Sequence, residues 1–154
     1  MGCDIHAFCE RSDSDGKWEY LPSVQVFDCR SYALFGWLAD VRNYSDIEPV
    51  AAPRGLPEDV SSSIKAEYGE EDGEAHGASW LTPEELLAVD YDRVVEDRRY
   101  IGRVAEGYLS GTLTAEPGKG TEMSLRQFLG ERYFFDLAAM QRAGVGRVVF
   151  WFDN

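Results

Sequence analysis

Apolar and polar side chains alternate at the start of the chain. Every second position carries the same kind of side chain, with Cys3, Ile5, Ala7 and Cys9 on one side and Asp4, His6, Phe8 and Glu10 on the other. Successive side chains of a strand point to opposite faces, so this period of two predicts a β-strand over residues 2–10. A turn at 12–16 then leads to a second strand at 17–21.

The end of the chain carries a different strand pattern. Residues 148–152 are all β-branched or aromatic. Both faces of such a strand are apolar, which is typical of a strand in the middle of a sheet. We therefore expect the first and last strands to belong to one small central sheet.

Helical spacing predicts the remaining regular structure. The apolar residues that repeat at this spacing are Leu34, Phe35 and Leu38 in a helix over about 31–41, and Val60, Ile64 and Tyr68 in a shorter one. A third helix is predicted to begin at Pro83, because Thr82 and Glu85 form a capping box. Residues 123–143 predict a single long helix that ends at Gly144.

The connecting segments are rich in turn-forming or charged residues. Residues 42–57 contain three prolines and one glycine and predict an ordered loop, whereas 69–77 is acidic and glycine-rich and predicts a mobile one. Residues 90–120 are ambiguous, with a strand-like stretch at 92–96 and possible pairing through 103–114. The order of elements predicts a single domain over 1–154 of the α+β (or mixed α/β) class, with three to four helices packed on the sheet.

The negative net charge of the chain limits the kinds of molecule that it is expected to bind. The formal net charge is −13, and residues 58–97 hold 13 acids against only Lys65 and Arg93. Such a surface repels phosphate backbones, which argues against general nucleic-acid binding. No apolar run is long enough to span a membrane and no signal peptide is recognisable, so we expect a cytoplasmic protein without membrane association. The three cysteines are expected to be buried, inert thiols.

The first candidate chemistry is a metal centre. Asp4 and His6 share one face of the first strand, and Asp153 would meet them if the last strand lies beside the first. Two carboxylates and an imidazole suit Mn²⁺, Zn²⁺ or Mg²⁺, which could activate water for phosphoester hydrolysis. Equally open are a structural Asp4 paired with an arginine such as Arg147, and a His6 ring that only bonds a neighbour.

Other residues are candidates for catalysis or ligand binding. His76, in the predicted mobile loop, is either an acid or base carried by a lid or an exposed side chain. Together with His6 and Asp153 it makes up the catalytic set. Arg42, Arg54 and Trp80 form the ligand-binding set, since guanidinium groups bind phosphate and an indole can stack on a base. For Arg54 a structural role in bonding loop carbonyls is equally open, and Trp80 could instead anchor the core.

The two ends of the chain carry a resemblance. The opening MGCDIH and the closing FWFDN resemble a family of small uncharacterised proteins found in bacteriophages and their bacterial hosts. The matching stretches, about a quarter of the chain, are 2–6, 34–42, 53–57, 76–82 and 148–154. The resemblance implies no established activity or catalytic residue, and it implies that 90–120 is a variable insertion.

Three functions remain open. The first is a pocket of Asp4, His6, Arg54, His76 and Asp153 that binds or hydrolyses a small phosphorylated, nucleotide-like ligand, which requires these residues to converge. The second is a non-enzymatic accessory protein that binds a host protein, for host takeover or against host defence. It requires residues 58–97 to form one continuous acidic surface. The third is a nucleotide sponge that binds without turnover.

Overall fold

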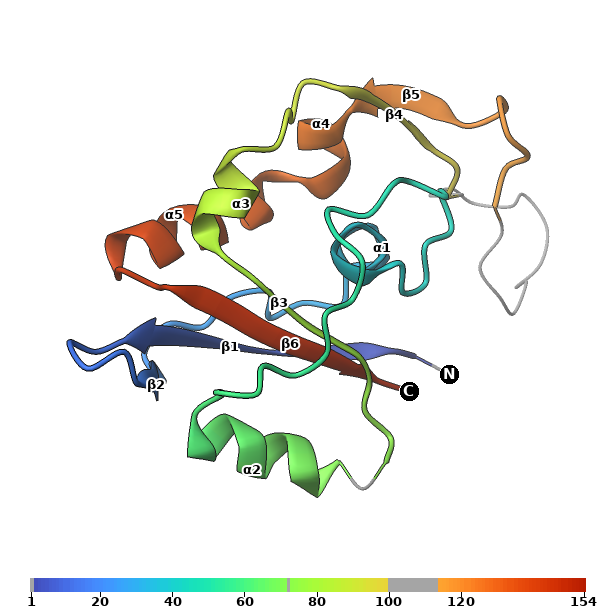
Figure 1. The fold of residues 1–154 in the computed structure, drawn as a ribbon. Helices are drawn as coiled ribbons and strands as arrows, with labels where there is room; N and C mark the ends of the chain where they lie inside the picture. The colour runs from blue at the N-terminus through green and yellow to red at the C-terminus, as the bar shows by residue number, and fades with distance from the viewer. Residues whose placement is uncertain (1, 72, 100–113) are drawn as a thin grey trace.

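The strands predicted at the two ends of the chain are neighbours in one antiparallel sheet. The computed structural model describes residues 2–71, 73–99 and 114–154. The strands of this sheet are β1 (Asp4–Ser12), β2 (Trp18–Tyr20), β3 (His76–Leu81) and β6 (Arg147–Asp153), in the order β2-β1-β6-β3 (Figure 1). A separate two-stranded sheet consists of β4 (Val94–Asp97) and β5 (Thr121–Ser124). The predicted α+β single domain is therefore confirmed.

The register places the two chain ends together. β1 and β6 pair from Asp4 opposite Asp153 to Glu10 opposite Arg147. Directly opposed residues point to the same face of a sheet. The polar residues of the opening strand therefore share a face with the last acidic residue of the closing strand, as the sequence pattern predicts.

Five helices are present in the described part of the chain, against the three to four expected. They are α1 (Tyr32–Ala39), α2 (Ser62–Glu70), α3 (Pro83–Leu87), α4 (Leu125–Leu129) and α5 (Glu131–Arg142). The capping box of Thr82 and Glu85 is present at the start of α3, as predicted. The single helix expected over 123–143 is wrong, because Ser124 caps α4 and Gly130, with φ of 83°, separates α4 from α5.

The predictions for 69–77 and 90–120 have different outcomes. The acidic loop expected over 69–77 is helical at its start, where α2 runs to Glu70, and extended at its end, where His76 opens β3 and pairs with Phe152. The strand-like stretch at 92–96 is present as β4. The pairing expected over 103–114 lies outside the described residues except for a bridge between Arg99 and Thr114.

Both faces of the large sheet are covered. Figure 1 shows α2 on one side of the sheet and the other helices on the opposite side. On the α2 side, Val149, Trp151 and Ile64 are fully buried and pack with Phe8 and Tyr68. The other side packs into the larger core, which includes Cys3, Cys9, Val148, Phe150 and Phe152. No helix in the described ranges is long and apolar enough to cross a lipid bilayer.

Candidate metal centre

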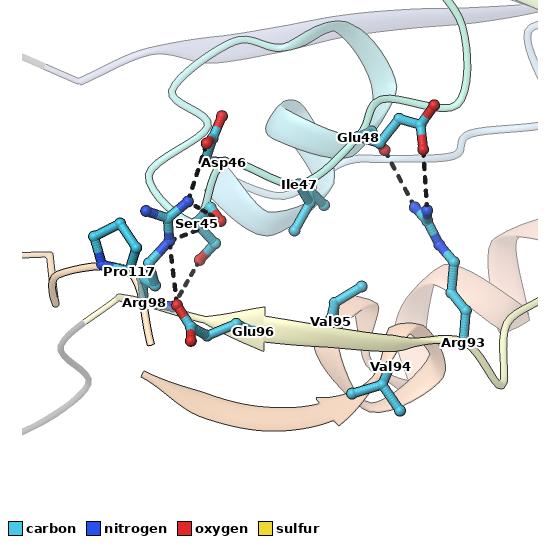
Figure 2. Close-up of a pocket in the computed structure, with 10 residues that line it drawn as sticks. All are labelled: Ser45, Asp46, Ile47, Glu48, Arg93, Val94, Val95, Glu96, Arg98 and Pro117. Carbon is cyan, nitrogen blue, oxygen red and sulfur yellow. Dashed lines mark hydrogen bonds and ion pairs between the residues drawn. The ribbon is translucent and has the colours of Figure 1, made fainter. Parts of the chain in front are cut away.

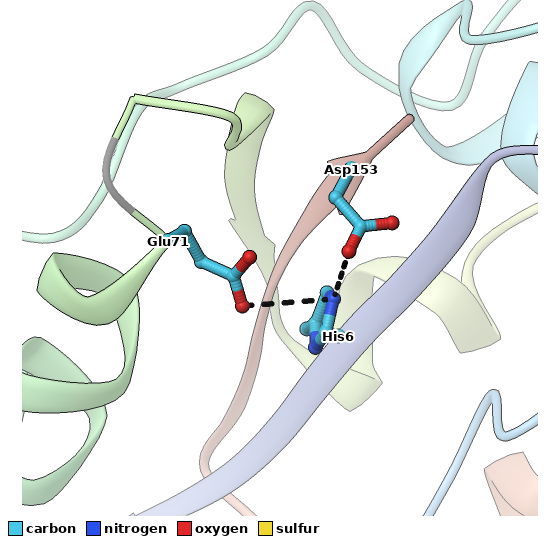
Figure 3. A group of neighbouring side chains, drawn as sticks. All are labelled: His6, Glu71 and Asp153. Carbon is cyan, nitrogen blue, oxygen red and sulfur yellow. Dashed lines mark hydrogen bonds and ion pairs between the residues drawn. The ribbon is translucent and has the colours of Figure 1, made fainter.

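Three donor side chains from separate segments meet on the α2 side of the sheet. His6 lies on β1, Asp153 at the end of β6, and Glu71 directly after α2 (Figure 3). The Nε2 atom of His6 is 3.0 Å from Oδ2 of Asp153 and 3.7 Å from Oε1 of Glu71. Ligand atoms from all three residues lie within 4.8 Å of one another. This His6–Glu71–Asp153 group, called the triad below, is the only such group of three in the described part of the chain.

Sheet register and helix docking bring the triad together. Alternation puts His6 on the α2 face, and pairing of β1 with β6 puts Asp153 one step further along the same face. Glu71 arrives through α2, where Ile64 is fully buried and the Tyr68 ring meets the Trp151 ring edge-on at 5.1 Å.

The His6 imidazole packs against Trp151 on one side and is partly exposed to solvent. The His6 ring stacks on Trp151 at a centroid distance of 5.9 Å and an angle of 14°. The side chains of His6, Glu71 and Asp153 remain 32%, 22% and 30% exposed. A fixed ring with solvent on its outer side combines preorganisation with access for water or a ligand.

The donor set has the chemistry of a transition-metal site. One imidazole nitrogen and two carboxylates suit Mn²⁺ or Zn²⁺, since the nitrogen favours a borderline ion and the oxygens supply charge. Three protein ligands on one side leave coordination positions open, which distinguishes catalytic from structural sites. Nε2 of His6 shares a hydrogen bond with Oδ2 of Asp153, and Oε1 of Glu71 lies in ion-pair range of the same nitrogen without a hydrogen bond to it.

Asp4, predicted as a metal ligand, lies outside the triad. Its carboxylate accepts hydrogen bonds of 2.8 and 2.6 Å from Nε and Nη2 of Arg30. The Arg30 guanidinium holds the pKa of Asp4 below its usual range. The arginine is therefore not Arg147, which instead pairs with buried Glu10 at 2.7 Å and with Asp59 at 2.8 Å.

Arg42 lies at the same end of the sheet. Its Nη2 donates to Oδ1 of Asn154 at 3.2 Å. Within the described ranges, it forms no ion pair with an Asp or Glu side chain. It also lies beside the Cys3 thiol, whose pKa is raised by burial against a lowering contribution from Arg42.

His76 does not join the triad. It is opposite Phe152 in the register and its ring stacks on the Phe152 ring at 6.1 Å, on the other face of the sheet from Asp153. Its Nε2 is enclosed and has no hydrogen-bond partner among the described residues. His76 is thus a strand residue rather than an exposed loop residue.

Arg54 and Trp80 lie at the opposite end of the sheet. From Arg147 to Asp153 β6 advances six residues, or about 20 Å, and Trp80 pairs with Val149 near the distant end. Arg54 stacks on Trp80 at 4.7 Å, donates to the Trp80 carbonyl at 3.1 Å and pairs with Glu85. The structural role for Arg54 is the one that this geometry supports, and the predicted single pocket is divided between two ends of the sheet.

Several cavities lined by described residues lie away from the triad. One, of about 540 Å³, is lined by Trp18, Arg54, Trp80 and Arg147 among others. Another, of about 350 Å³, lies between the 45–48 loop and β4 (Figure 2). Figure 2 shows that its two arginines are already engaged, Arg98 with Asp46 and Glu96, and Arg93 with Glu48. Neither cavity brings Arg42 or the triad into its lining.

The acidic segment 58–97 contributes elements to both sides of the large sheet. Figure 1 shows its α2 part on one side of the sheet and its α3 and β4 parts on the other. Several of its acids are also paired, among them Asp59 with Arg147, Glu85 with Arg54 and Asp97 with Arg99. The acids of 58–97 are therefore distributed over both sides of the sheet, and part of their charge is offset by these arginines.

Sequence reasoning missed Glu71 as a member of the site. It lies in a run of acids without a distinguishing pattern, and only the docking of α2 selects it. Comparison with protein-family models, curated proteins and solved structures finds no match for this chain. The candidate site accordingly rests on its own geometry.

Proposed function

We propose that the protein binds a divalent metal ion at His6, Glu71 and Asp153 and uses it to hydrolyse a phosphoester of a small ligand. The observation that carries the proposal is the convergence of three ligand atoms within 4.8 Å from three separate segments. A purely local acidic cluster would not contain an imidazole fixed by stacking on Trp151. Mn²⁺ and Zn²⁺ fit the mixed donors better than Mg²⁺, which prefers oxygen ligands.

Each residue of the triad has its own role in the proposed metal binding. Asp153 and Glu71 supply two negative charges, and His6 supplies a neutral nitrogen once its Nε2 proton has left. The stack with Trp151 keeps the imidazole plane fixed while this happens. A divalent ion bound here would lower the pKa of a coordinated water toward neutrality and polarise a phosphoryl oxygen. The partly exposed outer side of the triad lets the ligand approach.

The first test is metal binding. Elemental analysis and calorimetric titration with Mn²⁺ and Zn²⁺ should find one ion per chain. Glu71→Gln and Asp153→Asn should each weaken binding by at least about 10- to 100-fold, since even supporting residues of metal sites have effects of this size. The matched control is Asp4→Asn, which removes an equal charge nearby but leaves the triad intact. Equal losses in Asp4→Asn and Glu71→Gln would contradict the assignment.

The second test is turnover. Bis(p-nitrophenyl) phosphate and p-nitrophenyl phosphate report diester and monoester hydrolysis in the presence of Mn²⁺. Hydrolysis that follows the bound metal and is lost in Glu71→Gln supports the proposed activity. Metal binding without turnover of either compound, or of nucleotide substrates, would contradict hydrolysis and favour the sponge, which binds the ligand only.

A further inference from the structure

The cavity of about 540 Å³ lies on the same face of the sheet as the triad, at the other end of β6. The register puts Trp18 on β2, Arg147 on β6 and Trp80 on β3 on this face, and all three line the cavity. The loop residues 56–59, which precede α2, line another part of it. A cavity of this volume is large enough for a small organic ligand.

Indole and guanidinium groups stack on one another in the lining. The Cζ atom of Arg147 is 3.9 Å from the centre of the Trp18 ring, and that of Arg54 is 4.7 Å from the centre of the Trp80 ring. The Trp18 ring also lies against Gly146, where a Cβ atom would come within 2.7 Å of it. Both indoles are held in this way and remain partly exposed. Partly exposed aromatic rings of this kind are surfaces on which a flat aromatic ligand can stack.

The two arginines of the cavity are already paired with carboxylates. Arg147 binds Glu10 at 2.7 Å and Asp59 at 2.8 Å, and Arg54 donates to Glu85 at 3.0 Å. Their positive charges are therefore compensated within the protein. A simple anion such as phosphate is consequently not the ligand that this lining favours.

The lining nevertheless has hydrogen-bonding groups without partners. Glu58 is exposed and forms no ion pair within the described ranges. Arg54 donates through Nη1 and Nη2 but not through Nε, and its side chain is 29% exposed. Arg147 is 4% exposed and its Nη2 has no acceptor among the described residues. This atom is enclosed, so a ligand reaches it only when the Asp59 side chain, which is 66% exposed, moves aside.

We propose that this cavity binds a flat nitrogen heterocycle of the nucleobase class, with an amino donor and a ring-nitrogen acceptor. The ring stacks on Trp80, the amino group donates to Glu58, and the ring nitrogen accepts from Nε of Arg54. An anion would lack the donor for Glu58, and an organic cation would lack the acceptor and meet two guanidinium groups. The site is separate from the triad, because six residues of β6, or about 20 Å, lie between Arg147 and Asp153.

The test is calorimetric titration of the metal-free protein with adenosine and cytidine, each beside its counterpart without the exocyclic amino group. At least one amino compound should bind, and more tightly than its counterpart. Glu58→Ala should weaken the amino compound by about 10-fold, as expected for a hydrogen bond to a charged group, and leave the counterpart unchanged. Trp80→Leu should weaken both compounds by about 10-fold, because stacking is lost.

The matched control is Glu67→Ala. It removes an exposed carboxylate from α2, on the same side of the sheet but outside the cavity lining, and should bind like the parent. The inference is overturned if no compound binds, if the amino group makes no difference in the parent, if Glu58→Ala and Glu67→Ala lose equally, or if Trp80→Leu loses nothing. Asp153→Asn should bind the heterocycle like the parent, so failure of the metal centre is a separate result. Circular dichroism and thermal unfolding of each variant exclude loss of the fold.

Discussion

Asp4 and Asp153 are directly opposed on neighbouring strands, yet only Asp153 reaches His6. The difference lies in Arg30, whose guanidinium binds both oxygens of Asp4. Gly2 makes room for this arrangement, because the Arg30 guanidinium lies against its α-carbon where a side chain would clash. One of two matched carboxylates is thus neutralised, and the other is left for the triad.

Loss of Arg30 should release Asp4. In Arg30→Gln we expect the pKa of Asp4 to rise toward its ordinary value, because the hydrogen bonds from Arg30 are the main cause of its lowering. Carboxyl-carbon NMR titration of parent and variant measures this directly. An unchanged Asp4 pKa would show that the pair is not formed in solution.

The buried pair of Glu10 and Arg147 should be important for stability. Glu10 is fully buried and Arg147 is 4% exposed, with 2.7 Å between Oε1 and Nε. Glu10→Ala leaves the buried Arg147 guanidinium with only the largely exposed Asp59 as its ionic partner among the described residues, so it should lower the free energy of unfolding by up to about 3–5 kcal/mol. Urea unfolding measures the loss.

A double variant tests the cause. In Glu10→Leu with Arg147→Met, both charges are gone and similar volume is kept, so much of the stability should return. Asp59, which also binds Arg147, is largely exposed and can be solvated by water. If the double variant is as unstable as Glu10→Ala, the loss comes from packing rather than from the loss of the buried partner of Arg147.

The sequence predicts those features of the site that follow from the pattern of side chains along a single strand. Alternation assigns His6 to a face, and the apolar run at 148–152 places the last strand inside the sheet, so the meeting of His6 with Asp153 could be anticipated. Asp4 shows the limit of this reasoning, because its face was predictable and its partner was not. Arg30 lies in an irregular segment whose position no periodicity fixes.

The remaining site depends on packing between elements. Glu71 enters the triad because Tyr68 and Ile64 seat α2 on the sheet, and nothing in the acidic run around it marks it in advance. The same limit explains His76. A histidine that lies between Gly73 and Gly77 suggests a loop, but pairing with Phe152 makes it the first residue of a strand. Long-range pairing here outweighs local turn propensity.

Part of the loss of folding stability at acidic pH should come from protonation of Asp97. Burial raises the pKa of Asp97. Hydrogen bonds from the side chain and backbone of Arg99, and from Ser45, lower it by more, so the pKa of Asp97 lies below its ordinary value. A carboxyl with a lowered folded-state pKa contributes stability above its unfolded pKa and loses it as the pH falls through the folded value. Stability should therefore fall on acidification from about pH 5 to pH 2.

The variant Asp97→Asn isolates this contribution. It should be less stable than the parent at neutral pH, and its stability should fall less steeply over the same acidic range. Urea unfolding at a series of pH values gives both curves. Parallel curves for parent and variant would assign the acid sensitivity to other carboxylates.

Tyr68 should affect the metal site although it is not a ligand, because it holds α2 against the sheet. The Tyr68 ring packs edge-on against Trp151, one turn before Glu71, and Trp151 in turn stacks on His6. Tyr68→Ala removes this contact, so we expect weaker Mn²⁺ binding with all three ligands still present. Because Tyr68 is only partly buried, the loss of unfolding free energy should be about 1–3 kcal/mol. Tyr68→Phe keeps the ring and should retain both properties, and calorimetry on the two variants separates the effects. If Tyr68→Ala binds Mn²⁺ as tightly as the parent, Glu71 either reaches the metal without the docked helix or is not a ligand, and Glu71→Gln decides between these.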